Sequence, residues 1–158
     1  MQLLTADLVD EHESSLRCCE VQFRQFGGLA RFSGPVRTVK SFEDNTLIKQ
    51  ALSEPGKGAV LVVDGGGSVR CSLLGDYLVG VGLKNGWAGL VIWGAVRDTV
   101  ALGQLAIGLK ALGANPLRST KTGSGQRDIA VAFGGIVFRP NDWLYSDEDG
   151  IVVSERAL

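Results

Sequence analysis

Two short segments of the chain carry acidic, basic and backbone groups at a spacing that can build one pocket. The first is residues 75–78 (Gly-Asp-Tyr-Leu), and the second is Arg97-Asp98, with 20 residues between Asp76 and Arg97. Carboxylate oxygens suit hard divalent cations such as Mg²⁺ or Mn²⁺. The planar guanidinium group of Arg97 matches a carboxylate through two parallel hydrogen bonds. Together these groups suit a small 2-oxo acid, with its carboxylate on Arg97 and its keto oxygen on a metal ion.

The elements between the two segments predict that they meet. Residues 58–67 hold a continuous β-branched run bounded by glycines, which is typical of a strand buried on both faces. A Gly-rich loop, a helix that ends at Asn85-Gly86 and a second buried strand at residues 88–95 follow. Strand, helix and strand form a parallel βαβ unit with a right-handed crossover. Since ligands bind beyond the carboxyl ends of parallel strands, we expect both segments at one edge of the sheet.

The first segment also begins the helix of this unit. We expect Asp76 to be the N-cap, so that the amide groups of residues 75–78 lack intrahelical partners and point outward. With the helix dipole, such amides favour an anion. The spacing leaves a second interpretation open, in which Gly-Asp only caps a helix and Arg97-Asp98 only forms a surface salt bridge.

The remaining sequence predicts one α/β domain over residues 1–158, with a parallel βαβ centre and an antiparallel C-terminal half. In a helix at residues 43–54, Asp44 or Asn45 is the expected cap, and the acids there either cap the helix or contribute to a site. The other expected elements are a helix at 5–14 capped by Thr5, an irregular or edge strand at 35–42, a short helix and a strand within 99–113, a polar loop without a site at 121–128 and alternating strands within 129–154.

Composition argues against several classes of function. The net charge is −1, so no broad basic field attracts a phosphate backbone, and direct nucleic-acid binding is not expected. His12 is the only histidine, which disfavours a catalytic triad or a multi-histidine zinc site. The glycines at 65–67 lack the spacing of a dinucleotide fingerprint, because Arg70 stands where its third glycine belongs.

Cysteine usage and hydropathy bear on the compartment. The three cysteines form no CxxC pair, which indicates free thiols rather than a disulfide framework. No apolar run is long enough to span a bilayer, and the acidic N-terminal stretch does not resemble a secretory signal. We therefore expect a cytoplasmic protein with no membrane partner.

Beyond these patterns, six stretches in order along the chain resemble one family. They are QFRQFGG, FEDN, VLVVDGGGSVR, LLGDYL, GWAGLVIWGAVRD and GIVFRPNDWLYSDEDGIVVS. Together they resemble the family of the regulator of ribonuclease E activity A (RraA), which is grouped with the class II 4-hydroxy-4-methyl-2-oxoglutarate aldolases. The match covers nearly the whole chain without large gaps, so it is far more specific than any single motif.

The resemblance implies a swivelling β/β/α domain, assembled as a homotrimer with sites near the subunit interfaces. It also implies a metal-dependent lyase that cleaves 4-hydroxy-4-methyl-2-oxoglutarate, or the related 4-carboxy-4-hydroxy-2-oxoadipate, to pyruvate and a second oxo acid. Such a lyase also decarboxylates oxaloacetate. Both reactions pass through a pyruvate enolate, which a divalent metal ion (Mg²⁺ or Mn²⁺) next to the keto oxygen stabilises.

Residue by residue, the resemblance assigns a role to each member of the two segments. Arg97 matches the arginine that binds the pyruvyl carboxylate, and Asp98 matches the metal ligand. Asp76 matches the second acid, which acts through metal-bound water, and no lysine is assigned to form a Schiff base. The backbone stretch that holds the substrate is matched by Gly75, Asp76, Tyr77 and Leu78.

The same family has a second branch, whose members bind ribonuclease E and slow RNA turnover. In that branch the second acid of the Arg-Asp pair can be missing, which removes metal binding. Arg97, Asp98 and Asp76 are all present here, which favours the enzyme over the ribonuclease regulator. An older label as a menaquinone-pathway methyltransferase attaches to some relatives, but the chain has no S-adenosylmethionine signature.

Overall fold

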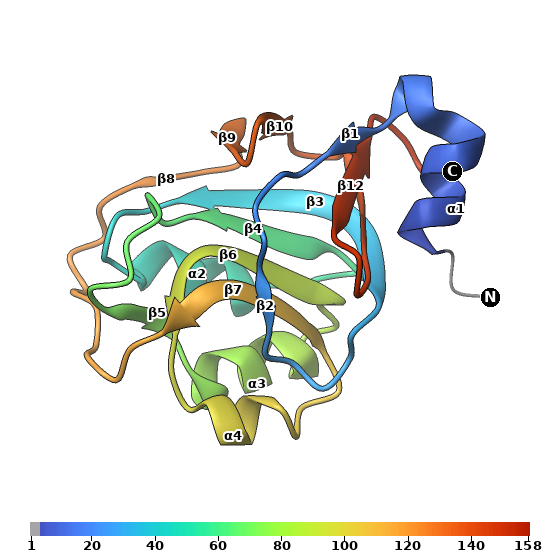
Figure 1. Ribbon diagram of the computed structural model, residues 1–158. Coiled ribbons are helices and arrows are strands. Elements are labelled where there is room, and N and C mark those ends of the chain that lie inside the picture. Colours follow the sequence, from blue (N-terminus) through green and yellow to red (C-terminus); the bar gives the residue numbers. More distant parts are fainter. Residues whose placement is uncertain (1–3) are drawn as a thin grey trace.

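A mixed sheet with helices on one face forms the centre of the computed structural model, which describes residues 4–158 (Figure 1). The helices are α1 (Thr5–His12), α2 (Thr46–Leu52), α3 (Asp76–Lys84) and α4 (Thr99–Leu102), with a 3₁₀ turn, η1, at Glu13–Ser15. The strands are β1 (Arg17–Cys18), β2 (Arg24–Gln25), β3 (Phe32–Lys40), β4 (Val60–Asp64), β5 (Ser72–Leu74), β6 (Gly89–Val96), β7 (Gly108–Ala114), β8 (Gln126–Arg127), β9 (Val131–Phe133), β10 (Ile136–Phe138), β11 (Trp143–Ser146) and β12 (Ile151–Ser154). The expected α/β class is confirmed.

The centre of the sheet is parallel. β3, β4, β6 and β7 run in the same direction and lie next to one another in that order. α3 lies between β4 and its neighbour β6 in the chain, so the expected βαβ unit is present. Val60 is paired with Gly89 and Asp64 with Trp93, so the two strands run toward the same edge of the sheet. This edge is where the loops that follow them gather.

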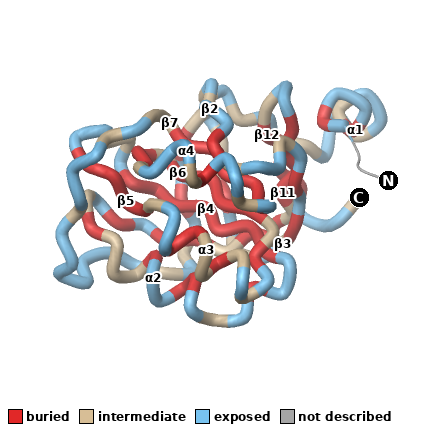
Figure 2. Tube along the Cα trace, turned by 90° about the horizontal axis from the view of Figure 1, so that it is seen from below, coloured by how far each residue is buried: buried red, intermediate tan, exposed pale blue. Residues whose placement is uncertain are grey.

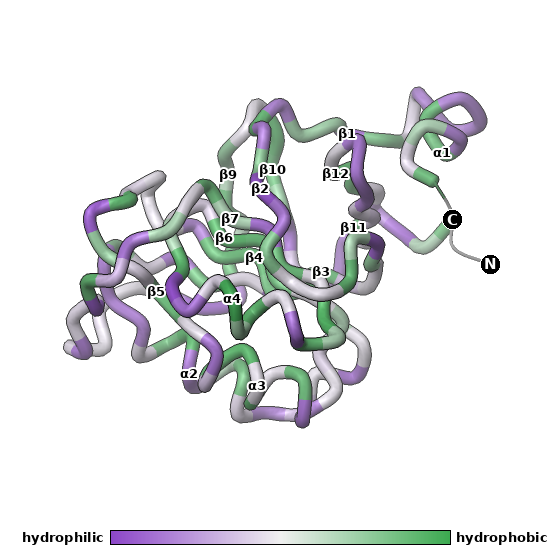
Figure 3. Tube along the Cα trace, turned by 60° about the horizontal axis from the view of Figure 1, so that its bottom comes forward, coloured by the Kyte–Doolittle hydropathy of each residue, from purple (hydrophilic) through white to green (hydrophobic). Residues whose placement is uncertain are grey.

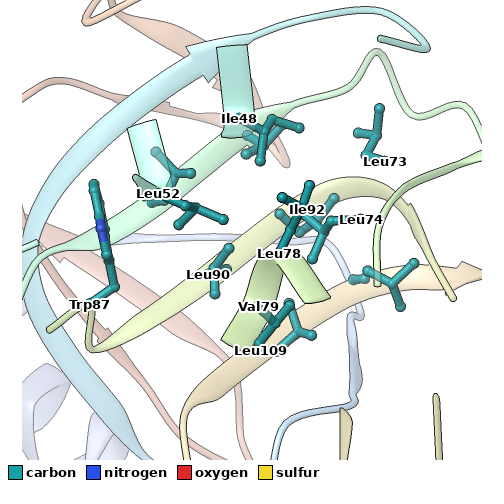
Figure 4. Close-up of a cluster of buried hydrophobic side chains, with 14 of the residues drawn as sticks. Ile48, Leu52, Leu73, Leu74, Leu78, Val79, Trp87, Leu90, Ile92 and Leu109 are labelled. Atoms are coloured by element: carbon teal, nitrogen blue, oxygen red, sulfur yellow. The ribbon is translucent and has the colours of Figure 1, made fainter. Parts of the chain in front are cut away.

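Alternate residues of the central strands pack into two hydrophobic cores, one on each face of the sheet. On β4, Leu61 and Val63 belong to the core under α2 and α3, whereas Val60 and Val62 belong to the core that includes the β9–β10 hairpin. Figure 4 shows the first core, in which side chains of α2 and α3 lie against those of β6 and β7. In Figure 2 buried residues follow the central strands and exposed residues follow the loops. Burial on both faces explains why these strands are apolar throughout.

β3 lies inside the sheet, so the prediction of an irregular or edge strand at residues 35–42 is wrong. Its first residues pair antiparallel with β11, and its last residues pair parallel with β4. β3 lies close to the loop between α2 and β4, and this is possible because Gly34 has no side chain. A Cβ on Gly34 would lie 2.1 Å from the carbonyl oxygen of Gly58 in that loop. β3 thus joins the antiparallel C-terminal half to the parallel centre.

The C-terminal half is antiparallel, as predicted. β9 and β10 form a hairpin around Gly134-Gly135, and β11 and β12 form another around Asp149-Gly150.

Thr5 does not cap α1 but is part of the helix, and its amide and hydroxyl both donate to the Asp147 carboxylate at 2.7 Å. Figure 3 shows hydrophobic residues along β4 and β6 and mostly hydrophilic ones on α1. Within residues 4–158, no helix has the length and apolar character that crossing a membrane requires.

Candidate active site

β5, a short strand that the sequence does not predict, brings the two segments of the candidate site together. β4 ends opposite Trp93, and after a Gly-rich loop β5 takes its place beside β6, with Ser72 paired to Ala95 and Leu74 to Val96. The amide of Arg97 donates to the carbonyl oxygen of Leu74 at 3.0 Å. The chain therefore leaves β5 directly beside the point where it leaves β6.

Asp98 caps α3 from the neighbouring loop. Its Oδ2 atom accepts the amide N–H of Asp76 at 3.1 Å. Asp98 has a φ of 61°, in the left-handed region that aspartate tolerates better than most residues. The prediction that Asp76 is the N-cap is wrong: Asp76 is the first helical residue, and Gly75, the N-cap, has no side chain with which to accept a hydrogen bond. The Asp98 charge also lies at the positive end of the α3 dipole.

Two further amides at the start of α3 remain available. The first intrahelical bond runs from Val79 to the carbonyl oxygen of Gly75 at 3.1 Å. In the described part of the chain, the amides of Tyr77 and Leu78 donate to no protein acceptor. The Leu78 side chain is buried in the core, which fixes this turn, whereas the Tyr77 side chain is 71% exposed. Two oriented N–H groups are the elements of an anion seat.

Gly75 is the point of closest approach between the two segments. A Cβ on Gly75 would lie 2.2 Å from Asp98 Oδ2 and 3.2 Å from Arg97 Cγ. The Arg97 side chain thus passes next to Gly75, and its Nη1 atom donates to the carbonyl oxygen of Pro116 at 3.3 Å. Only glycine leaves room for both side chains here.

A cavity of about 370 Å³ lies over these groups. Gly75, Asp76, Tyr77, Leu78, Arg97 and Asp98, all expected from the sequence, line it. The expectation that the two segments share one edge of the sheet therefore agrees with the structure, while the roles of these residues remain predictions. The other residues that line the cavity are Asn45, Thr46, Lys49, Ser72, Leu73, Leu74, Arg118, Ser119 and Lys121.

Three cationic residues on the cavity wall are missing from the sequence-based prediction. Lys49 comes from α2, and Arg118 and Lys121 come from the segment after β7. The expectation that the loop at 121–128 has no place at a site is therefore wrong for Lys121. No local pattern marks these residues, because only long-range pairing brings them here: Ser72 forms a β-bridge with Arg118, and Asp44 forms one with Thr120.

Asp44 ties this loop to the start of α2. Its side chain is fully buried and accepts hydrogen bonds from the amides of Thr46, Thr122 and Gly123 and from the hydroxyls of Thr120 and Thr122. Burial alone raises the pKa of this carboxyl, but the hydrogen bonds from Thr122, Thr46 and Thr120 outweigh burial and hold its pKa well below the usual range. The N-cap residue of α2 is Asn45, whose side chain makes no capping hydrogen bond, and Asp44, one residue earlier, accepts the first helical amide from Thr46. Of the two interpretations of this segment, the role at the start of the helix is therefore supported, and Asp44 does not line the cavity.

The carboxylates of the cavity fit a metal ion that keeps several waters. Asp98 Oδ1 and the Asp76 carboxylate make no hydrogen bond with residues 4–158, so both are free to coordinate. Across those residues no group of three or more His, Cys, Asp or Glu side chains is gathered as a metal cage. Mg²⁺ commonly binds through one or two carboxylates, with waters and substrate oxygens completing the octahedron. The donor set therefore suits such a cation.

The chain is similar in sequence to one family of proteins over nearly its whole length. The profile of the family described as RraA-like (Aldolase/RraA) matches residues 5–153. A protein of Alkalilimnicola ehrlichii is 56% identical over 158 residues, which is 100% of this chain and 98% of that protein. A protein of Laribacter hongkongensis is 54% identical over 100% of this chain and 99% of its own length. Both are named "Putative 4-hydroxy-4-methyl-2-oxoglutarate aldolase".

Two solved structures are similar over almost their whole length. One, described as an S-adenosylmethionine: 2-dimethylmenaquinone methyltransferase from Geobacillus kaustophilus, has a TM-score of 0.98 and 44% identity, covering 99% of this chain and 97% of its own. The other, the RNA-processing inhibitor RraA from Thermus thermophilis, has a TM-score of 0.97 and 44% identity, covering 100% and 96%. The family resemblance found in the sequence is thereby confirmed.

Proposed function

The chain belongs to the RraA-like (Aldolase/RraA) family, and from this premise we propose that it is a divalent-metal-dependent lyase acting on 4-hydroxy-2-oxo acids. The proposed substrate is 4-hydroxy-4-methyl-2-oxoglutarate, which is cleaved to pyruvate and a second oxo acid. Oxaloacetate decarboxylation is the proposed side activity. The names of the two relatives that are more than half identical support the substrate.

One observation carries the proposal. Arg97, Asp98 and the free amides of Tyr77 and Leu78 line a single cavity, although they come from the ends of different strands. A guanidinium group and two amides can bind a carboxylate, while the neighbouring acids can hold a cation. A 2-oxo acid needs both kinds of group side by side. If Arg97 and Asp98 formed only a surface salt bridge, they would be expected to pair with each other or with a neighbour, and neither makes an ion pair within residues 4–158.

In the proposed mechanism, Arg97 binds the carboxylate next to the keto group and orients the substrate. The amides of Tyr77 and Leu78 donate to the same end of the molecule, where the α3 dipole favours negative charge. Because Gly75 has no side chain, the substrate carboxylate can approach the backbone closely at this point. These contacts fix the C3–C4 bond relative to the acids.

Cleavage then requires one proton transfer and one bond break. The C4 hydroxyl loses its proton, C4 becomes the carbonyl carbon of the second oxo acid, and the electrons of the C3–C4 bond pass into a pyruvate enolate. Protonation of the enolate at C3 gives pyruvate. We assign the proton acceptor to Asp76, whose carboxylate lines the cavity and has no hydrogen-bond partner in the described chain.

Asp98, with Asp76 next to it, is the residue that would hold the metal ion. A bound divalent cation would supply Lewis-acid stabilisation to the negative charge that develops on the keto oxygen. Loss of carbon dioxide from oxaloacetate leaves the same enolate, so Arg97 and the α3 amides serve both reactions in the same way. In both reactions Arg97 and the α3 amides bind the pyruvyl end of the substrate, and only the leaving group differs.

Replacement of Asp98 by asparagine tests the proposal at the metal ligand. Asparagine tolerates the left-handed backbone and its amide oxygen can still accept the Asp76 amide, so the fold should be kept. We expect Mn²⁺ binding, measured by calorimetry, to be lost. Metal-dependent pyruvate release should fall at least about 100-fold, because Lewis-acid stabilisation is worth several kcal/mol. Unchanged Mn²⁺ affinity in the variant would remove Asp98 from the proposed ligand set.

A second candidate function is supported by the structural neighbours. The 44% identical structure from Thermus thermophilis is described as an RNA-processing inhibitor, and a 30% identical structure from Streptomyces coelicolor belongs to a family of RNase ES inhibitors. A regulator that binds ribonuclease E without catalysis is therefore the alternative. A pull-down with ribonuclease E distinguishes the two, and no binding at micromolar concentration would argue against regulation. Assembly as a homotrimer in the cytoplasm belongs to both proposals and rests on the family resemblance.

A further inference from the structure

We propose that Asn115 is a positioning residue for the lyase reaction, because it fixes a turn whose carbonyl group orients the Arg97 guanidinium. Asn115 follows β7 and does not line the cavity, so it acts through Arg97 and not on the substrate. It also lies outside every stretch that carries the family resemblance. The inference rests on the proposed function, in which Arg97 binds the carboxylate next to the keto group.

The turn after β7, Asn115-Pro116-Leu117, is fixed by Asn115 itself. Its Oδ1 atom accepts the amide N–H of Leu117 at 2.9 Å, which is the hydrogen bond of an Asx turn. Its own amide donates to the carbonyl oxygen of Val96, the last residue of β6, at 3.0 Å. Pro116 has a fixed φ and restricts the residue before it to extended conformations. Together these restraints set the direction of the Pro116 carbonyl group.

Further bonds tie the turn to β5 and to the Gly-rich loop before it. Asn115 Nδ2 donates to the carbonyl oxygen of Val69 in that loop at 2.9 Å. Ser72 of β5 donates its amide at 2.8 Å and its hydroxyl at 3.1 Å to the carbonyl oxygen of Leu117. The Asn115 side chain therefore uses both its acceptor and its donor within the protein. No replacement by an apolar residue can keep these contacts.

The turn acts on one nitrogen of Arg97 and leaves the others available. Arg97 Nη1 donates to the carbonyl oxygen of Pro116 at 3.3 Å. The described residues offer no acceptor to Nε or Nη2. The N–H groups of these two atoms point the same way along one edge of the guanidinium, and a carboxylate can accept from both at once. The Pro116 carbonyl thus reserves this bidentate edge for the substrate.

Holding Arg97 in place before the substrate arrives has two consequences. The side chain loses less conformational freedom on binding, so the carboxylate is bound more tightly. The plane of the guanidinium also fixes the orientation of the bound 2-oxo acid, and with it the position of the C3–C4 bond relative to Asp76. Loss of the turn should therefore weaken the binding of every 2-oxo acid, including pyruvate.

The variant Asn115→Ala tests the effect on Arg97 directly, because it leaves every residue of the cavity wall unchanged. Nuclear magnetic resonance of the ligand-free chain reports the order parameter of the Arg97 Nε–H group. We expect a value of roughly 0.8 in the wild type and below about 0.6 in Asn115→Ala. The control is Gln104→Ala, which removes an exposed side-chain amide that does not line the cavity and should keep the wild-type value.

A double-mutant cycle separates positioning of Arg97 from a general loosening of the fold. With Mg²⁺ present, calorimetry should show that Asn115→Ala binds pyruvate at least about fivefold more weakly than the wild type. In an Arg97→Lys background the same replacement should change the affinity by less than about twofold, since lysine has no bidentate edge to orient. Asn115→Ser, whose hydroxyl can accept the Leu117 amide, should recover part of the lost affinity.

An Arg97 order parameter that is unchanged in Asn115→Ala would overturn the inference. So would a loss of affinity that is equally large in the Arg97→Lys background, or an Asn115→Ser variant that binds no better than Asn115→Ala. Pyruvate binding and release that are normal in Asn115→Ala would refute the role of Asn115 and leave the lyase standing. A wild-type chain that neither binds nor releases pyruvate would refute the lyase and, with it, the positioning of Arg97 for that reaction.

Discussion

Gly75 is the residue at which the two segments of the candidate site touch. Any Cβ at this position would lie 2.2 Å from Asp98 Oδ2, closer than nonbonded atoms can approach. Its φ of −136° is accessible to every residue, so the requirement for glycine comes from space and not from backbone conformation. The sequence shows the glycine but not this reason, because the carboxylate that fills the space belongs to a loop 23 residues further along.

Gly75→Ala should therefore disrupt the site. The Asp98 carboxylate must move away, which removes the cap on α3 and costs roughly 1–3 kcal/mol of stability as overpacking does elsewhere. Urea unfolding measures the loss, and pyruvate binding by calorimetry should weaken in parallel. The control is Gly80→Ala in the middle of α3, where a Cβ meets no atom within 4 Å. Gly80→Ala should raise the free energy of unfolding by about 0.5–1 kcal/mol. A Gly75→Ala variant that behaves like this control would contradict the steric account.

At the scale of elements, β5 and the Asp44-bound loop decide the shape of the site. The sequence predicts β4, α3 and β6 because each has a long periodic or apolar signal, and these elements fix the edge of the sheet where the site lies. β5 has three residues, and β1, β2 and β8 have two each, so they have no local signal and form only by pairing with longer strands. The positions of the three cationic residues on the cavity wall, Lys49, Arg118 and Lys121, cannot be predicted from the sequence for the same reason. The wall depends on hydrogen bonds between Asp44 and a loop more than 70 residues away in the chain.

The variant Asp44→Asn tests, through the free energy of unfolding, whether Asp44 holds the loop that contains Thr120 and Thr122 in place. The variant loses charge-assisted hydrogen bonds to a fully buried carboxylate, so the free energy of unfolding should fall by about 2 kcal/mol or more at neutral pH. Because the pKa of Asp44 in the folded protein lies below its ordinary value of 3.8, its contribution is complete above that pH and is lost as the pH falls further. The difference between wild type and variant should therefore shrink below about pH 3.8.

The measurement is urea unfolding of both proteins across this range of pH, with Asp10→Asn as the control. Asp10 is exposed on α1 and its side chain makes no hydrogen bond or ion pair with residues 4–158, so this variant should match the wild type. An Asp44→Asn variant whose stability deficit is small at pH 7, or does not depend on pH, would show that Asp44 is not the anchor of the loop.

At the scale of the whole molecule, both cores depend on the same strands. Alternate residues of β4 and β6 face opposite sides of one sheet and belong to different cores. Disruption of these strands would therefore remove packing from both cores at once. We propose on this basis that residues 1–158 fold as one domain, as the sequence predicts. Trp87 lies in the core under the helices, and Trp93 packs against the core on the other face, where it stacks on Phe133 at 5.1 Å.

Unfolding should accordingly be a single cooperative transition. Tryptophan fluorescence and far-ultraviolet circular dichroism should give the same urea midpoint, since every probe reports the same event. The variant Trp93→Phe removes the reporter on one face and should leave the two midpoints coincident. Separate midpoints for the two signals would show that the faces unfold independently and would contradict the one-domain proposal.

The most direct test of the account is pyruvate release from 4-hydroxy-4-methyl-2-oxoglutarate by the purified chain. With Mg²⁺ or Mn²⁺ present, the account predicts two molecules of pyruvate for each molecule of substrate, because the second oxo acid from this substrate is also pyruvate. A chelator should stop the reaction, and Arg97→Ala should lower kcat/KM at least about 100-fold through loss of a charge-assisted bidentate contact. No pyruvate from the wild-type protein at any concentration of metal, or a rate that is unchanged in Arg97→Ala, would contradict it.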